Sequence, residues 1–196
     1  MEHRMDDIVN FLKKLPKNER NRIMASVIGM TVEQQNENTR IYEASKKYQR
    51  LPIKQWPAFE MKWDLTPENR RFALDGYDTD TFKKNYPDGL IVGHVRFQEF
   101  HSKLAAHSRR TKEEIWDTGS VPKLGRAILY YVEGNAMTPP FICVDDRDAN
   151  SVIIGGGYHR IAICLAREVE TIPILVMPAE KDSIGRILLS AKWEDE

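Results

Sequence analysis

The sequence predicts an α/β (α+β) fold: a small mixed sheet with flanking helices, preceded by an N-terminal helical extension. Short β-branched apolar runs, such as residues 151–154, alternate with segments of helical period, such as residues 121–132. The first 50 residues instead carry thin apolar stripes at helical spacing. A length of 196 residues with 41% hydrophobic content is sufficient for one core domain and an extension.

The 29 basic and 29 acidic residues cancel. Zero net charge argues against a protein that coats DNA indiscriminately, although a local basic patch stays open. No apolar run approaches the ~18 residues of a membrane span, and the first residues lack the apolar core of a signal peptide. Cys143 and Cys164 lie in apolar runs. We therefore expect reduced thiols in a cytoplasmic protein that does not enter a membrane.

Residues 1–50 are the predicted helical extension. Apolar residues recur at helical spacing over 6–15, Pro16 breaks that helix, and a second helix is expected from about residue 17 to residue 50. A long polar helix with a narrow apolar stripe usually packs on a partner or on its own protein. A homodimer through these helices and packing within one chain are equally open.

Residues 51–89 form a connecting segment rich in proline and aromatic residues. We expect Trp56, Phe59 and Trp63 to bury this segment onto the domain, with stacking on nucleic-acid bases as the alternative. A cap followed by proline at 66–67 predicts a short helix over 67–75.

Residues 90–196 form the predicted core domain. The expected strands are residues 90–97, with a possible bulge at Gly93, then 141–144, 151–154 and 171–177. The second and third of these form a hairpin, and Pro173 favours an edge or strand-start position in the last. Helices are expected over 121–132, where Gly134 ends the helix, from the glycines to about 168, and over 180–193.

The run Gly-Gly-Gly-Tyr-His-Arg at 155–160 joins a predicted strand to a predicted helix. Backbone N–H groups at a helix start lack intrahelical partners, and the helix dipole adds positive potential, so such a turn can seat an anion. His159 and Arg160 add donors in the first helical turn. A tight connection would need one glycine, and three followed by these two residues favour the anion site.

The order of these elements resembles the ParB/sulfiredoxin superfamily over about residues 90–178. The matching segments are Pro139-Pro140, the run at 155–160, and Glu-Thr-Ile-Pro at 170–173. The resemblance implies that the glycine turn binds nucleotide phosphates, with further contacts from the segment after the first strand. The implied contacts are Gly155, Gly156, Gly157, His159, Arg160, Ser102 and Lys103.

Two departures from the superfamily limit what it implies. The reactive cysteine of sulfiredoxin stands just before the motif histidine, where this chain has Tyr158. Tyrosine cannot supply the thiolate, so we do not expect sulfinic acid reduction. The helical DNA-reading domain of chromosome-partitioning ParB proteins has no counterpart in this sequence. Small phage and plasmid members that resemble this chain include nucleases, nucleoside triphosphatases and kinases of free serine.

Two other groups of residues could carry chemistry. Asp145, Asp146 and Asp148 could hold Mg²⁺, although a solvated hairpin turn explains them equally well. The basic segment 101–112 is either a solvated face or a loop that closes on phosphate or nucleic acid.

These observations lead to one hypothesis and one alternative. The chain is expected to bind a nucleoside triphosphate, ATP or CTP, with Mg²⁺, and to act as a nucleoside triphosphatase, phosphotransferase or nuclease of a phage or plasmid. His159 and Arg160 would stabilise the developing phosphate charge. The alternative is a non-catalytic accessory protein that responds to nucleotide or DNA.

Overall fold

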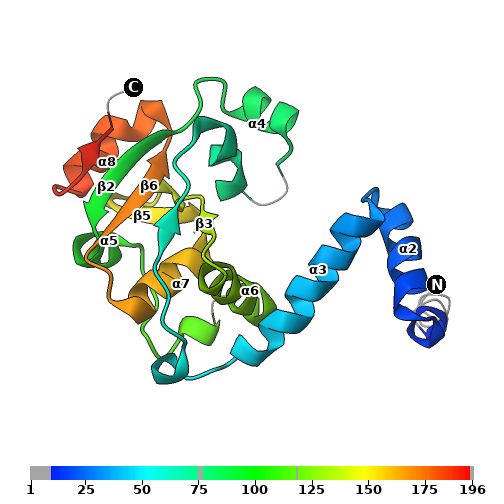
Figure 1. The fold of residues 1–196 in the computed structure, drawn as a ribbon. Helices are drawn as coiled ribbons and strands as arrows, with labels where there is room; N and C mark the ends of the chain where they lie inside the picture. The colour runs from blue at the N-terminus through cyan, green and yellow to red at the C-terminus, as the bar shows by residue number, and fades with distance from the viewer. Residues whose placement is uncertain (1–9, 75–76, 118, 195–196) are drawn as a thin grey trace. The chain divides into compact units, whose positions relative to one another are not determined.

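A computed structural model describes residues 10–74, 77–117 and 119–194 of the chain (Figure 1). The chain divides into two compact units, Met1–Lys46 and Lys47–Glu196. The first nine residues of the predicted helix-rich extension, including part of the helix expected over 6–15, lie outside the described residues, and residues 10–14 are helical.

Two helices, α2 (Lys17–Ile28) and α3 (Val32–Ser45), lie where one continuous helix was predicted. Gly29 ends α2 in the left-handed conformation, with φ 68°. Thr31 then begins α3 with a capping box, because its side chain accepts from the Gln34 backbone and the Gln34 side chain accepts from the Thr31 backbone. The prediction of one helix was wrong. The segment has few apolar residues, so no clear helical period is present whose interruption would mark the break.

The second unit is a mixed α/β structure, as predicted. Its five-stranded sheet has the order β5-β4-β6-β2-β7. The strands are β2 (Ile91–Arg96), β4 (Phe141–Asp145), β5 (Asp148–Gly156), β6 (Thr171–Val176) and β7 (Lys192–Trp193). Strand β4 is parallel to β6, and the other neighbouring pairs are antiparallel. The predicted hairpin of β4 and β5 is confirmed.

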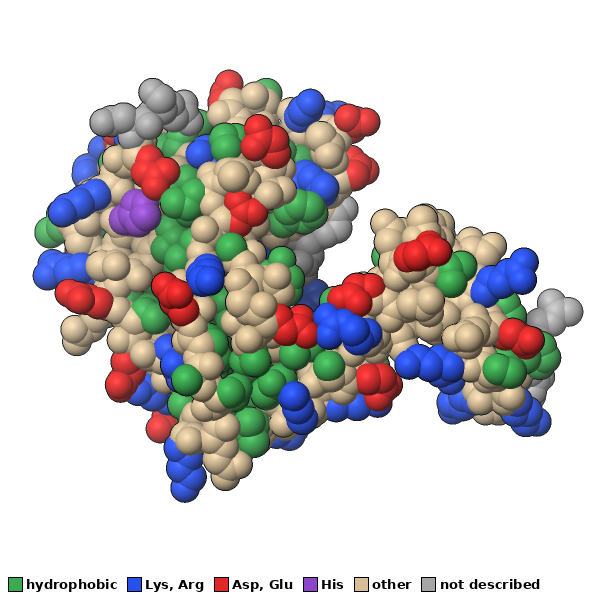
Figure 2. Space-filling view, viewed as in Figure 1, with side chains coloured by type: hydrophobic (Ala, Val, Ile, Leu, Met, Phe, Trp, Pro, Cys, Tyr) green, Lys and Arg blue, Asp and Glu red, His purple; other side chains and the backbone are tan. Residues whose placement is uncertain are grey.

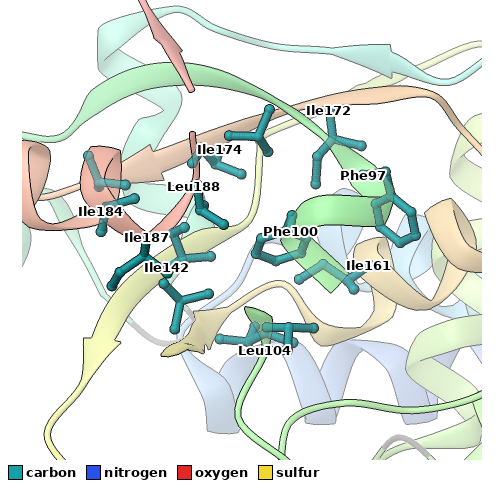
Figure 3. Packing of buried hydrophobic residues seen from close by; sticks show 14 of the residues in the cluster. Phe97, Phe100, Leu104, Ile142, Ile161, Ile172, Ile174, Ile184, Ile187 and Leu188 are labelled. Carbon is teal, nitrogen blue, oxygen red and sulfur yellow. The ribbon is translucent and has the colours of Figure 1, made fainter. Parts of the chain in front are cut away.

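Three helices cover one face of this sheet. They are α5 (Phe97–Lys103), α7 (Tyr158–Arg167) and α8 (Lys181–Ile187). Alternate strand residues such as Ile142, Ile172 and Ile174 meet Phe100 of α5 and Leu188 in the main core (Figure 3). Burial of this apolar face is what holds the helices on the sheet.

The proline- and aromatic-rich segment contains η2 (Ile53–Gln55), β1 (Lys62–Trp63), η3 (Pro67–Ala73) and α4 (Thr79–Asn85). Its later part, with η3 and α4, covers the opposite face of the sheet, where Ala73, Leu74 and Phe82 pack with Val92 and Leu175. Strand β1 pairs with β3 (Ala136–Met137) after α6 (Val121–Val132). The short helix predicted over 67–75 is the 3-10 helix η3. Two further 3-10 turns are η1 (Lys46–Tyr48) and η4 (Ile115–Asp117).

The aromatic residues of this segment pack on the domain, as predicted. Trp56 is buried and meets the edge of the Trp116 ring, with centroids 6.3 Å apart. Phe59 stacks on Tyr131 at 5.8 Å, and Trp63 meets the same ring edge-on at 6.2 Å. These rings therefore serve internal packing in this structure.

Gly93 and Pro173 differ from their predicted roles. Gly93 is not a bulge, because it pairs in register with Ile174 and Trp193. Pro173 lies inside a central strand and not at an edge. The N–H of Leu175 in β6 donates to the Pro140 carbonyl, on the side of β6 that faces β4. The nitrogen of Pro173, two residues earlier, faces the same side, at a position where β4 does not yet pair with β6. The missing donor therefore leaves no gap in the ladder.

The C-terminal segment is also more broken than predicted. The helix expected over 180–193 is a 3-10 turn, η5 (Pro178–Glu180), followed by α8 and the edge strand β7. The helix predicted over 121–132 is confirmed, and Gly134 follows it with φ 79°. None of the helices in the described ranges has the length and hydrophobicity needed to cross a bilayer.

Candidate functional site

The candidate site is the turn from β5 into α7. Gly155 and Gly156 are the last residues of β5, and Gly157 is the N-cap of α7. Gly157 has φ 98°, a conformation that residues with a Cβ rarely adopt, and no side chain caps the helix. The N–H groups of Arg160 and Ile161 bond to the Gly157 carbonyl at 2.9 and 3.1 Å. The N–H groups of Tyr158 and His159 belong to the first helical turn, where no intrahelical acceptor exists.

Each of the three glycines has a steric reason that involves no ligand. A Cβ on Gly155 would lie 2.7 Å from the Phe141 ring, and one on Gly156 would lie 2.1 Å from the Ala73 carbonyl oxygen. A Cβ on Gly157 would lie 2.9 Å from the Pro140 Cα. Close packing therefore requires all three residues, so their number is not evidence for an anion.

Arg160 is held by backbone carbonyl groups. Its side chain is buried, and its guanidinium donates to the Thr138 and Pro139 carbonyls at 2.6 and 2.9 Å and to the Phe72 carbonyl at 3.3 Å. These bonds tie α7 to η3 and to the Pro139-Pro140 segment. The geometry does not favour the predicted direct contact between this guanidinium and a phosphate, because the donors point at carbonyls of the protein.

The charge of Arg160 still acts on its surroundings, because carbonyl groups are neutral acceptors. Burial raises the pKa of the Tyr131 phenol, and the Arg160 charge opposes part of that rise. Burial also raises the pKa of the Cys164 thiol, and the Arg160 charge again opposes part of that rise. A positive charge therefore lies behind the first turn of α7, where it adds to the potential of the helix dipole.

His159 and Tyr158 are half-buried, and the His159 Nε2 atom is buried. The His159 Nε2 atom lies 3.9 Å from the position that a Cβ on Gly119 would take. The Tyr158 hydroxyl lies 3.3 Å from the hydroxyl of the buried Ser108. The proximity of Ser108 and Gly119 to this turn was not predicted, because nothing local in the sequence marks either residue.

Ser102 and Lys103 lie at the end of α5 and do not join the other predicted contacts. The Ser102 hydroxyl donates to the Glu99 carbonyl. Both residues line a polar cleft of about 520 Å³. The ionisable residues that share this cleft are Lys103, His107, Arg109, Asp145 and Asp148. The structure thus divides the predicted set between two places.

The predicted acidic turn has local roles. Asp145 is buried and accepts from the Arg147 N–H at 3.0 Å, and Asp148 accepts from the Asn150 N–H at the same distance. Within the described ranges, no group of three or more His, Cys, Asp or Glu residues is arranged to hold a metal ion. Acidic and basic side chains are interspersed on the face shown in Figure 2.

No family model, no curated protein and no solved structure matches this chain.

Proposed function

We propose that this chain binds the phosphate groups of a nucleoside triphosphate at the first turn of α7. The observation that supports the proposal is that Gly157 begins α7 without a side-chain cap, while the buried Arg160 cation lies behind the same turn. Backbone N–H groups and a positive field at a helix start suit an anion. The resemblance to ParB/sulfiredoxin proteins supports ATP or CTP as the class of ligand.

Arg160 has a different role in this proposal from the one that its motif implies. Its guanidinium holds the turn in place and contributes positive potential, and the direct contacts come from the N–H groups of Tyr158 and His159. His159 remains the side chain proposed to contact the phosphate. We propose that the protein acts in the cytoplasm, where the free thiols of Cys143 and Cys164 would stay reduced.

Binding without turnover is the form of the function that this geometry supports best. The residue expected to stabilise a transferring phosphate, Arg160, donates to three backbone carbonyls. The protein would then be a nucleotide-responsive accessory protein, with DNA as a further partner.

Catalysis is the second candidate, and one observation favours it. The Ser108 and Tyr158 hydroxyls lie 3.3 Å apart, and Tyr158 is the first residue of α7. Attack of either oxygen on the γ-phosphorus of a bound triphosphate would form a phosphoester, with release of the nucleoside diphosphate and of the hydroxyl proton. With Mg²⁺ such a site would transfer phosphate or hydrolyse a phosphodiester. Product formed from ATP, CTP or plasmid DNA only with Mg²⁺, and lost in Tyr158→Phe or Ser108→Ala, would support this form.

The binding proposal is tested by titrating the chain with ATP, CTP and pyrophosphate in a calorimeter, with and without Mg²⁺. His159→Glu places a carboxylate in the first turn of α7. It is expected to weaken binding at least about tenfold by occupying the anion position, and the melting temperature of the variant separates this effect from a loss of stability. His159→Gln should have the smaller effect on binding.

Gln98→Glu is the matched control, since it adds the same charge at an exposed position of α5. Equal loss of affinity in Gln98→Glu and His159→Glu would place the ligand elsewhere. Absence of binding by the wild-type chain to all three ligands would refute the proposal.

A further inference from the structure

The N-terminal unit buries very little of its own surface. Short connections make α2 and α3 a helical hairpin, and the Asn21 amide donates to the Asn36 side chain at 2.7 Å between them. In the part of Met1–Lys46 that the structure describes, the buried residues are Ala25, Asn21 and Ser45. Two helices of 12 and 14 residues are marginal without tertiary packing, and the helical residues 10–14 add no buried residue. Within the described residues of this unit, the helices therefore bury less apolar surface than stable packing requires.

Helix α2 carries apolar residues on the side opposite its contact with α3. Ile23 is 39% exposed and Val27 is 76% exposed. They follow Asn21 and Ala25 by two positions, which is about 200° around a helix, so the exposed pair faces away from α3. Met24, the residue after Ile23, is half-buried. This exposed face of α2 is the surface that a partner would cover.

The two helices carry opposite charges. Helix α2 has three basic residues and one acidic residue, which are Lys17, Arg20, Arg22 and Glu19. Helix α3 has one basic residue and three acidic residues, which are Arg40, Glu33, Glu37 and Glu43. A two-fold axis that places α2 of one copy beside α3 of another brings these opposite charges together twice. The zero net charge of the chain adds no overall repulsion between copies.

We infer that the hairpin is a self-association surface, on which α2 of one copy packs against α3 of a second copy. The four helices form a bundle that covers Ile23 and Val27 in both copies. The occupant is a second copy of this chain because the complementary charge is already present on the hairpin itself. This inference is independent of the proposed nucleotide site.

Sedimentation velocity of the full chain over a range of concentrations tests the inference. The wild-type chain is expected to form dimers, and Val27→Glu is expected to raise the dimer dissociation constant about tenfold or more. Ser26→Glu is the matched control, since it adds the same charge at an exposed position about 100° around α2 from both Val27 and Ala25, and it should leave the dimer intact. Circular dichroism of each variant checks that the helices remain formed.

A mixing experiment tests which helices meet. One variant carries Lys17→Glu and Arg20→Glu, and the other carries Glu33→Lys and Glu37→Lys. Each variant alone has hairpin helices of like sign and should associate weakly, whereas an equimolar mixture should form heterodimers at wild-type strength. A wild-type chain that stays monomeric overturns the inference. So does a dimer that Val27→Glu leaves unchanged, or a mixture that fails to associate.

Discussion

The guanidinium of Arg160 donates a 2.6 Å hydrogen bond to the carbonyl of Thr138. Thr138 directly precedes the Pro139-Pro140 segment, and Pro140 packs against Gly157 at the start of α7. The arginine and the glycine of the turn therefore contact the same short segment. This relationship makes the motif arginine a positioning residue, whose first effect is on the stability of the turn.

Arg160→Ala is expected to destabilise the fold by about 3 kcal/mol, because it leaves buried carbonyls without charged donors. Urea unfolding followed by circular dichroism measures the change. Arg109→Ala is the control: Arg109 is exposed and donates to one carbonyl at 3.3 Å, so its loss should cost under about 0.5 kcal/mol. Equal stability of the two variants would contradict the positioning role.

Gly156→Ala is expected to be severely destabilising, by about 3 kcal/mol or more, because its Cβ would lie 2.1 Å from the Ala73 carbonyl oxygen. Backbone atoms cannot yield as a flexible side chain can. Gly185→Ala in α8 is the contrasting change, since its Cβ would lie at an ordinary 3.7 Å from the Trp193 ring nitrogen. It should be neutral or stabilising by up to about 1 kcal/mol, as alanine favours helices. Thermal melts of both variants give the comparison.

Most of the elements near the glycine turn could be predicted from the sequence. The β4–β5 hairpin, α6 and the strand-to-helix turn have clear apolar periods, and such periods report local structure directly. The break between α2 and α3 was missed, although Gly29 and the Thr31–Gln34 capping box were readable signals. Helix α5 was also missed, because its seven residues are too few to show a period.

The contacts of the candidate site could not be predicted in the same way. Gly156 is required by Ala73, and Arg160 is oriented by Phe72, both on a segment far away in the sequence. The residue types at the turn predicted an anion-binding site. The packing of the folded chain explains the same glycines and the same arginine without a ligand. A motif arginine can donate to a ligand or to the protein, and only its tertiary neighbours decide which.

Gly93→Ala is expected to displace Trp193 and release the edge strand β7. The added Cβ would lie 2.6 Å from the Trp193 ring, and β7 pairs with β2 at only two positions. We expect a loss of about 1–3 kcal/mol, typical of overpacking, with a red shift of tryptophan emission as the indole becomes hydrated. The double variant Gly93→Ala, Trp193→Leu should recover part of the stability. If the double variant were less stable than Gly93→Ala, the steric account would be wrong.

Cys143 should react slowly with alkylating reagents. Burial, with smaller effects from the Glu180 and Asp146 carboxylates, raises the pKa of its thiol from 9.0 to about 12. The thiolate is the nucleophile, so at pH 8 the folded chain should react with iodoacetamide about a hundredfold or more slowly than the urea-unfolded chain.

The pH dependence of this reaction gives the sign of the effect. Because the folded pKa is raised, the neutral buried thiol stabilises the fold below pH 9, and this contribution is lost as pH rises from about 9 towards about 12. The alkylation rate of folded Cys143 should therefore keep rising between pH 9 and pH 11, where the unfolded chain has levelled off. Mass spectrometry of Cys143→Ala, which retains only the buried Cys164, separates the two thiols. A folded-state rate that levels off near pH 9 would show that the thiol is solvated.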